Sequence, residues 1–501
     1  MNRIPQNTGV LWAISESGVL WGGGVQGMEQ EKVFERLFKL IEQHHCQQTQ
    51  GTFVEYHEPQ ELRELLQLEK KDSQEDLDQL FHWVEKYLKY AVKTGHPGYL
   101  NRMWAGANLP SMVGEMVTAI SNTSACTYET APVSTLMEQY MFQEMLNLVG
   151  FKNGVGQMTT GSSNANMIAM MAARNTHSTC TKTQGLFGQA PLCAFVNEDA
   201  HYSMDRAASI LGIGTDYLIK VAIDDHGRMI PDALEQAIEN AKQRGCVPFF
   251  VAATAGTTVR GAYDPIGALL DLRDRHGFWL HVDGAWGGAA VLSERLRLKY
   301  LPRLEESDSF TLDFHKMLGS SLMCNVLLFN GRSGILRKIC SAGDESYIFR
   351  EGDNGETRDL GTLSLQCGRK VDALKWFLDW KFYGQQGLAA RVEKYYELCR
   401  YAEERILANP NLEMVVPRES FNLCFRYIPP VGSSKDEFTI ALRSQLQKTE
   451  RALVGTGYVK GQVVMRLLIT NTNVDKDAID RFLSNVVLSG KELCRQYEQA
   501  C

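Results

Sequence analysis

The chain has 501 residues, which is too long for one small core and favours two or three packed subdomains. Its net charge of −7 and isoelectric point near 5.9 argue against a surface that binds nucleic acid or an anionic membrane. With 44% hydrophobic and 22% charged residues the composition is that of a soluble globular protein, and no apolar run approaches the roughly 20 residues of a membrane span.

Residues 1–95 are expected to form a leader and a helical arm. The first residues, 1–24, hold one early arginine and a short apolar patch without a sustained apolar core. This pattern predicts a poorly ordered leader rather than a signal peptide. From Gln60 to Thr94, apolar side chains recur at helical spacing among charged residues, which predicts an amphipathic arm with no chemistry of its own.

Residues 96–370 alternate between strand and helix patterns and are expected to form a large domain. Its clearest unit is an apolar strand at Val247–Thr258, a helix opened by Asp264-Pro265 and ended by Gly277, and a strand at Phe278–Asp283. Apolar strands separated by single helices predict an α/β fold with a mostly parallel sheet covered on both faces. Active sites in such sheets lie at the carboxyl ends of the strands.

Three polar segments stand where these strands end or helices begin. The turn at Gly161–Asn164 leads into a helix and could offer N–H groups and hydroxyls to a phosphate, although an ordinary serine-capped helix has the same pattern. His201 follows an apolar run and could stack on a flat cofactor ring; the alternative is a surface histidine. Thr254 ends another strand near the same edge.

Two further segments, His281–Gly288 and Asp313–Gly319, fit the chemistry of pyridoxal phosphate. Lys316 has the amine that forms a Schiff base with the cofactor aldehyde. Asp283, at a strand end, has the carboxylate that keeps the pyridine nitrogen protonated, so that the ring can accept electrons from a bond broken at the substrate's α-carbon. Together and in this order, the two segments favour a cofactor site over a capping aspartate and a surface lysine.

Residues 371–501 have a different pattern and are expected to form a small α/β domain. A long helix from Val371 to Leu407 is expected to break near Gly384–Gly387. Strands are predicted at Phe421–Tyr427 and Val463–Thr470, followed by a closing helix from about residue 475.

The cysteines give no sign of a metal site. Twelve are scattered between Cys46 and Cys501 without a Cys-x-x-Cys pair, and several lie in apolar runs. Reduced thiols in a cytoplasmic protein fit this pattern better than a disulfide framework or a zinc site.

Taken as a set, these motifs resemble the group II amino-acid decarboxylases that depend on pyridoxal phosphate and have fold type I, in the glutamate, cysteine-sulfinate and aspartate branch. The likeness covers nearly everything from His96 to Asp480. The resemblance implies a seven-stranded type of sheet and an intertwined homodimer with active sites at the interface, to which the N-terminal arm would contribute. The segments that carry it are HPGYLN at 96–101, TYETAPV at 127–133, DAHYS at 199–203, TAGTTVRGAYDPI at 254–266, HVDGAWGG at 281–288, HKMLG at 315–319, QCGRKVD at 366–372 and NLCFRYIPP at 422–430.

The resemblance also implies catalytic roles. Lys316 matches the Schiff-base lysine, Asp283 the partner of the pyridine nitrogen, and His201 the histidine that stacks over the ring. Tyr347, in the glycine- and charge-rich stretch 342–361, matches the tyrosine of a mobile loop. Its implied role is to protonate the α-carbon once carbon dioxide has left; the alternative is a tyrosine packed on the surface.

The remaining cofactor contacts follow by position. Ala285 is expected under the ring, Ser162 and Ser163 at the phosphate, Thr254 against the cofactor, and His315 next to the lysine. Before that histidine the family has Asn-Pro, where this chain has Asp313-Phe314. The family's backbone conformation is therefore not assumed for this segment.

Four residues bear on the substrate. Arg466 matches the arginine that grips a substrate carboxylate, although a structural salt bridge is the alternative for an arginine in an apolar strand. Arg102 replaces a glutamine that contacts the carboxylate. Trp104 stands where glutamate decarboxylases have a small residue and the other branches phenylalanine, and Ser124 where glutamate decarboxylases have asparagine. A bulky indole and added cationic capacity favour a short acidic substrate.

The leading hypothesis is therefore α-decarboxylation of aspartate to β-alanine or of cysteine sulfinate to hypotaurine. A glutamate decarboxylase producing γ-aminobutyrate is the second hypothesis. An aminotransferase or an oxidative aldehyde synthase is the third, and a cofactor-free scaffold descended from such an enzyme is the non-enzymatic alternative. No nucleic acid, membrane or metal is expected as a partner.

Overall fold

The computed structural model describes residues 27–68, 77–349 and 358–500. The chain forms two compact units, one up to Lys93 and one from Thr94. The leader expected at 1–24 lies outside the described residues. In the part of the chain that is described, no helix is both long and apolar enough to cross a membrane.

The first unit is helical. Apolar side chains at helical spacing in 60–94 predict helices there. Three helices form in the described part of this unit, and the second and third lie in that range, which confirms the prediction. Arg36 joins the first to the third through ion pairs with Asp78 (2.6 Å) and Glu85 (3.1 Å). The helices are α1 (Gly27–Cys46), α2 (Pro59–Leu66) and α3 (Leu77–Tyr90).

The second unit contains a seven-stranded sheet with the order β2-β8-β7-β6-β5-β3-β4. The five strands from β7 to β4 pair in parallel, whereas β8 runs antiparallel to both of its neighbours. The expected α/β fold with a mostly parallel sheet is therefore confirmed. The strands are β2 (Val155–Thr159), β3 (Leu192–Asn197), β4 (Leu218–Val221), β5 (Val247–Thr254), β6 (Trp279–Asp283), β7 (Ser309–Asp313) and β8 (Asn325–Phe329).

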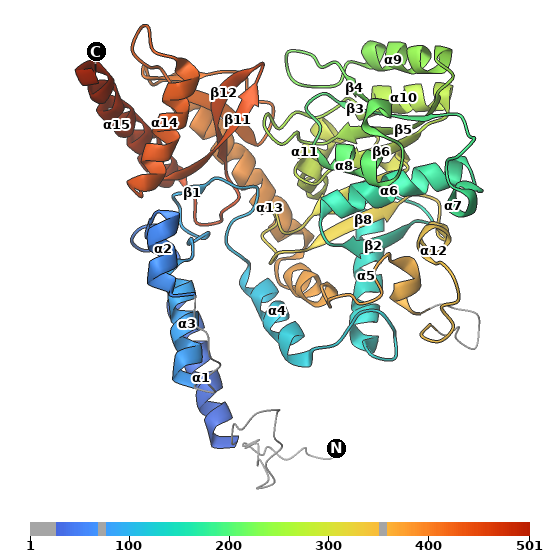
Figure 1. Cartoon of the computed structure of the whole chain (residues 1–501), viewed down its shortest axis with the longest axis horizontal. Helices are drawn as coiled ribbons and strands as arrows, with labels where there is room; N and C mark the ends of the chain where they lie inside the picture. Colours follow the sequence, from blue (N-terminus) through green and yellow to red (C-terminus); the bar gives the residue numbers. More distant parts are fainter. Residues whose placement is uncertain (1–26, 69–76, 350–357, 501) are drawn as a thin grey trace, which may run out of the picture. The chain divides into compact units, whose positions relative to one another are not determined.

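Helices cover both faces of this sheet because its strands are apolar on both sides (Figure 1). In β3, Phe195 packs into the cluster that includes Leu234 of α9 and Leu269 of α10, whereas Ala194 and Val196 pack into the cluster of α6 on the opposite face. The helices before residue 350 are α4 (Leu109–Ser121), α5 (Pro132–Val149), α6 (Ser162–His177), α7 (Thr181–Gln184), α8 (Ser203–Ile210), α9 (Pro231–Gln243), α10 (Ile266–His276), α11 (Glu294–Tyr300) and α12 (Ile335–Cys340).

A five-stranded sheet with the order β1-β11-β12-β10-β9 forms from the C-terminal part of the chain and one short strand near residue 100. Its strands are β1 (Tyr99–Leu100), β9 (Leu412–Met414), β10 (Asn422–Tyr427), β11 (Leu453–Val459) and β12 (Gln462–Leu468). The helices are α13 (Ala373–Leu407), α14 (Lys435–Lys448) and α15 (Lys476–Ala500). The break expected in the long helix is confirmed at Gly384, whose φ of 63° and ψ of 172° interrupt α13.

One local prediction is wrong. Asp264 does not cap α10, because the helix begins one residue later than expected and Pro265 takes the capping position. The Asp264 carboxylate is buried and accepts hydrogen bonds from Thr254 N (2.7 Å) and Met229 N (2.7 Å). Gly277 does end the helix, in the left-handed conformation with φ of 75°.

Candidate active site

The parallel strands of the large sheet end in polar residues at one edge. Thr254 ends β5 and is the register partner of Asp283, which ends β6, while Asp313 ends β7. All three side chains are buried. The carboxyl ends of these strands therefore gather a threonine and two carboxylates where the sequence predicts the site.

Asp283 lies at the end of a hydrogen-bonded chain that begins inside the sheet. Trp279 Nε1 donates to Ser309 Oγ (2.8 Å), and that hydroxyl donates to His281 Nδ1 (2.8 Å). His281 Nε2 donates to Asn166 Oδ1 (2.9 Å), and Asn166 Nδ2 donates to Asp283 Oδ2 (2.8 Å). The Asn166 amide that donates to Asp283 is thus oriented by a chain of three further side chains.

The protonation state of His281 follows from its surroundings. Burial lowers the pKa of His281 to about 4, against the smaller opposing effect of Asp283. The ring is therefore neutral near pH 7, with its single N–H on Nε2 facing the Asn166 carbonyl oxygen. This tautomer leaves the Asn166 amide free to donate to the carboxylate.

Lys316 forms an ion pair with Asp313, three residues earlier. Lys316 Nζ lies 2.9 Å from Asp313 Oδ2, and the carboxylate is buried. Burial alone would raise the pKa of Asp313, but the charges of Lys316 and His315 hold it below its ordinary value. The lysine amine is thereby fixed next to a charged carboxylate.

The beginning of α6 belongs to the same network. Asn325 Nδ2 donates to Ser162 Oγ (2.9 Å) and to Asp313 Oδ1 (2.7 Å), so this one amide links the helix to the lysine's partner. The helix expected after the turn at Gly161–Asn164 forms, but it begins earlier, at Ser162, and Gly161 before it has a φ of 113°. The first N–H groups of a helix have no acceptor within it and favour an anion.

His201 lies within electrostatic reach of both charged groups. Burial is the largest cause that lowers the pKa of His201; Asp283 raises it and Lys316 lowers it. The ring packs on Tyr202, with centroids 4.1 Å apart. Ala285 is also close, because its backbone N–H donates to Asp283 Oδ1 (3.1 Å).

Other expected site residues have different surroundings. His315 is buried and its Nδ1 contacts the backbone of Cys324, with the oxygen at 2.9 Å. Ser163 is exposed at the start of α6. Tyr347 is 84% exposed, and residues 350–357 of the stretch expected to form a loop around it lie outside the described residues.

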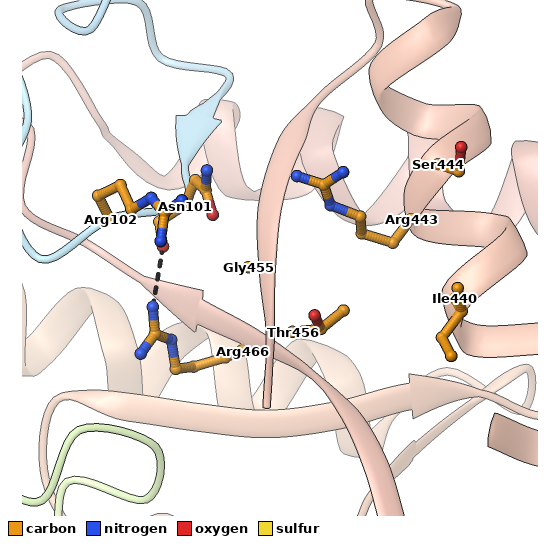
Figure 2. A pocket seen from close by; sticks show the side chains of 8 residues that line it. All are labelled: Asn101, Arg102, Ile440, Arg443, Ser444, Gly455, Thr456 and Arg466. Atoms are coloured by element: carbon orange, nitrogen blue, oxygen red, sulfur yellow. Dashed lines mark hydrogen bonds between the residues drawn. The ribbon is translucent and has the colours of Figure 1, made fainter. Parts of the chain in front are cut away.

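Arg466 and Arg102 line one cavity of about 420 Å³ (Figure 2). Arg466 Nη1 donates to Thr258 O (2.9 Å) and Nη2 donates to Asn101 O (3.2 Å). Its Nε is buried without a hydrogen-bond partner, and among the described residues no carboxylate pairs with it. A structural salt bridge, the alternative considered from the sequence, therefore does not hold Arg466 in position.

All charged residues that line the cavity are arginines. In Figure 2, Arg102 and Asn101 lie with Arg466 on one side of strand β11, and Arg443 of α14 lies on the other. No acidic residue lines it. Burial lowers the pKa of Arg466, and the positive charge of Arg102 lowers it further.

Trp104 and Ser124 are not among the residues that line this cavity. The Trp104 indole packs against Tyr99, with ring centroids 5.9 Å apart. The Ser124 hydroxyl donates to Arg369 O (3.2 Å) and accepts from Arg369 N (3.1 Å). Both hydrogen bonds tie Ser124 to a neighbouring segment.

The substitution at Phe314 is accommodated by packing. Its side chain is 1% exposed and its ring packs on Trp376, with centroids 5.2 Å apart. Phe314 N and His315 N both donate to Cys324 O, at 2.9 and 3.3 Å. Here an aromatic contact and two backbone hydrogen bonds hold the segment that presents Lys316.

The residues fit the cofactor that the sequence suggests. Asp283 faces donors only, Asn166 Nδ2 and Ala285 N, and an ionised carboxylate has about four acceptor positions, so it can accept from a pyridinium N–H as well. Lys316 supplies the amine and the start of α6 an anion site.

Sequence reasoning missed three polar residues that build this network: Asn166, Asp313 as the lysine's partner, and Asn325. A signal for Asn166 was present, because it is the one amide in the otherwise apolar helical run 165–173. Asn325 opens an apolar strand, where a polar residue is unusual. Nothing in the sequence indicates that Asn166 contacts Asp283 or that Asn325 contacts Ser162, each more than a hundred residues away.

Comparison with known proteins gives consistent results. A family model described as the pyridoxal-dependent decarboxylase conserved domain matches residues 59–428. Mouse cysteine sulfinic acid decarboxylase is 36% identical over 88% of this chain and 91% of its own, and human acidic amino acid decarboxylase GADL1 is 35% identical over 88% and 86%. A crystal structure of mouse CSAD in apo form superimposes with a TM-score of 0.88 at 34% identity, covering 92% of this chain and 99% of that one.

Proposed function

Because the chain belongs to the pyridoxal-dependent decarboxylase family, we propose that it removes the α-carboxyl group of a short acidic amino acid. Aspartate, giving β-alanine, and cysteine sulfinate, giving hypotaurine, are the proposed substrates. The observation that carries the choice of substrate is the cavity lined by Arg466 and Arg102 without an acidic residue. Relatives named for cysteine sulfinic acid and for acidic amino acids support it.

The strand-end cluster supplies the groups that hold the cofactor and prepare the reaction. When bound, pyridoxal phosphate supplies an electron-accepting ring for the electron pair left on the substrate's α-carbon. Lys316 would hold it covalently through Nζ, Asp283 would keep the proton on its ring nitrogen, and the start of α6 with Ser162 would bind its phosphate. Thr254, Ala285 and His201 would line its ring.

Arg466 is proposed to bind a carboxylate of the substrate. Two of its N–H groups are fixed on carbonyl oxygens, so the guanidinium keeps one orientation, and its buried Nε lacks an acceptor. A substrate carboxylate would supply that acceptor, with a charge-assisted bond. Arg102, whose charge already acts on Arg466, is proposed to attract the second acid group.

Product analysis tests the assignment. The holoenzyme would be offered aspartate, cysteine sulfinate, cysteate and glutamate side by side, and we expect amine products from the four-carbon and sulfur acids in preference to γ-aminobutyrate. A preference for glutamate would refute the proposed substrate but leave the decarboxylase activity. Formation of aldehyde or an exchanged amino group would favour the third hypothesis.

Lys316→Ala separates an enzyme from a cofactor-free scaffold. The variant should lose the visible absorbance of lysine-bound pyridoxal phosphate together with nearly all turnover. Lys491→Ala, at an exposed position on α15, serves as the control. Wild-type protein without such a band after incubation with the cofactor would favour the scaffold.

A homodimer is proposed from the exposed apolar side chains of two helices. On α4, Leu109, Val113, Val117 and Ile120 recur at helical spacing and are all exposed. On α5, the exposed set is Val133, Leu136 and Tyr140. Exposed apolar helix faces of this kind mark a protein interface, and a second copy would cover them.

Tyr347 is proposed to protonate the substrate carbon after decarboxylation. Its phenol is exposed, so in the proposed homodimer it is available to the active site of the second copy. The location is proposed to be cytoplasmic, since the eleven cysteines in the described part of the chain are all free thiols.

A further inference from the structure

Two cysteines far apart in the sequence have their thiols in contact. Cys126 Sγ lies 3.7 Å from Cys367 Sγ, and 241 positions separate the two residues. They differ in access to solvent: Cys126 is 5% exposed, whereas Cys367 is exposed. Cys367 can therefore react with a dissolved oxidant, and the buried Cys126 thiol is close enough to react with Cys367 afterwards.

The backbone around the pair is already fixed. Cys126 lies in the segment 122–131, which packs along the segment 358–372; the contact between these two segments is here called the seam. Gly361 N donates to Cys126 O (2.8 Å), and Ala125 N donates to Arg369 O (2.9 Å). Tyr128 N donates to Asp359 Oδ1 (2.8 Å). These bonds hold the two cysteines in register on either side of their thiol contact.

We infer that Cys126 and Cys367 form a redox modification site, which glutathione disulfide converts to an intramolecular disulfide. The Cys367 thiolate attacks one sulfur of glutathione disulfide, forming a mixed disulfide and releasing one glutathione thiolate. Cys126 Sγ, losing its proton to solvent, then attacks the Cys367 sulfur and releases the second glutathione. Two protein thiols are oxidised and one glutathione disulfide is reduced to two glutathiones, so atoms and electrons balance.

The order of attack follows from the two environments. Burial and the hydrogen bond with Cys367 together raise the pKa of Cys126 to about 12, so Cys126 is a poor first nucleophile. The sulfurs need to close from 3.7 Å to the roughly 2 Å of a disulfide, a movement that side-chain rotation can supply in large part. The inference is independent of the proposed substrate.

Thiol mapping of the full-length protein tests the site. After treatment with glutathione disulfide and alkylation of the remaining thiols, non-reducing peptide mass spectrometry should show a peptide pair joined through Cys126 and Cys367. Its mass should be lower by two hydrogen atoms, and dithiothreitol should restore both thiols. Cys193 and Cys246, which are both buried, should stay reduced and serve as the internal control.

Two variants separate the steps. Cys126→Ser should leave a stable glutathione adduct at Cys367, and Cys367→Ser should leave Cys126 unmodified because it is buried. Cys180→Ser, which removes an exposed thiol elsewhere, should keep the joined peptide pair. A wild-type protein that carries only the glutathione adduct at Cys367, or in which both thiols remain open to alkylation, would overturn the inference.

Discussion

At the scale of single residues, the most consequential arrangement is the chain of donors that ends on Asp283. Every member from Trp279 to Asn166 has its partner, and each is buried. Removing one member leaves a buried donor or acceptor unsatisfied, which typically costs about 1–3 kcal/mol. The carboxylate therefore depends on groups that never touch the cofactor.

Asp283→Asn should keep the shape of this site but lose its charge. Without a carboxylate the ring nitrogen would not stay protonated, and we expect a fall in kcat on the order of 10³-fold or more. Stopped-flow decarboxylation assays measure it, with cofactor absorbance as the control for binding. Turnover near that of the wild type would mean that the carboxylate only holds the strand end.

Asn166→Leu tests whether Asn166, which donates to Asp283, positions that carboxylate. The variant removes the donor to Asp283 and leaves His281 Nε2–H without its acceptor. We expect kcat to fall by roughly 10- to 10³-fold with a shifted cofactor absorbance maximum. An effect on thermal stability alone, with the spectrum and kcat unchanged, would assign Asn166 to structure.

The neutral His281 predicts how stability depends on pH. Its pKa falls from 6.5 in the unfolded chain to about 4 in the fold, so between these values the unfolded state binds more protons. Stability should therefore decrease as pH falls from about 6.5 to 4, by up to about 1.4 kcal/mol per pH unit for this residue. Urea unfolding at several pH values measures the slope, and His281→Gln should reduce it. Equal slopes in both proteins would assign the effect to other histidines, such as His201 and His315, whose pKa values are also lowered.

Substrate choice is also testable with single residues. If Trp104 limits substrate length, Trp104→Ser combined with Ser124→Asn should raise activity on glutamate relative to aspartate by roughly 10- to 200-fold, because an overpacked methylene costs about 1–3 kcal/mol. The ratio of kcat/KM values measures it. An unchanged ratio would fit the packing of Trp104 on Tyr99, outside the arginine cavity.

At the scale of elements, β11 and β12 together place the Arg466 guanidinium. Gly455 is the register partner of Arg466, and a Cβ there would lie 3.0 Å from Asn101 O and 3.4 Å from Arg466 Nη2. Because Gly455 has no side chain, there is space at this point of β11 for the Arg466 guanidinium.

Gly455→Ala should disturb this arrangement without altering the cofactor site. We expect KM for the acidic substrate to rise by about 10-fold, equivalent to about 1.4 kcal/mol, while cofactor absorbance stays the same. Gly334→Ala is the matched control, since nothing lies within 4 Å of its added Cβ. A raised KM in both variants would point to a general loss of stability.

The elements also show what the sequence could predict. The strand–helix–strand unit at 247–283, the Gly384 break and the presence of a helix after Gly161 follow from local patterns, because turn chemistry and apolar spacing are local properties. The pairing of β1 with β11 and the hydrogen bond from Asn325 to Ser162 join segments more than a hundred residues apart, which no local pattern encodes. The role expected of Asp264 failed for the same reason, since its partners come from two other segments.

At the scale of the whole molecule, the exposed apolar face of α4 and α5 sets the assembly that we propose. Val117→Lys with Ile120→Lys should place two charges in that face and shift the protein towards monomer, with loss of activity if the site needs two copies. Light scattering after size-exclusion chromatography measures the mass. Leu298→Lys, an exposed position on α11, is the control, and a double variant that stays dimeric and active would locate the interface elsewhere.

The antiparallel pairing of β2 with β8 has a consequence for synthesis on the ribosome. Val155 pairs with Phe329, so the edge strand of the large sheet waits for a partner made long after it. At about 5–20 residues per second this interval lasts roughly 9–35 s. Throughout it, β2 has no strand to pair with, and its open edge exposes the nascent chain to aggregation. Chaperone binding should therefore concentrate on chains arrested between these two strands.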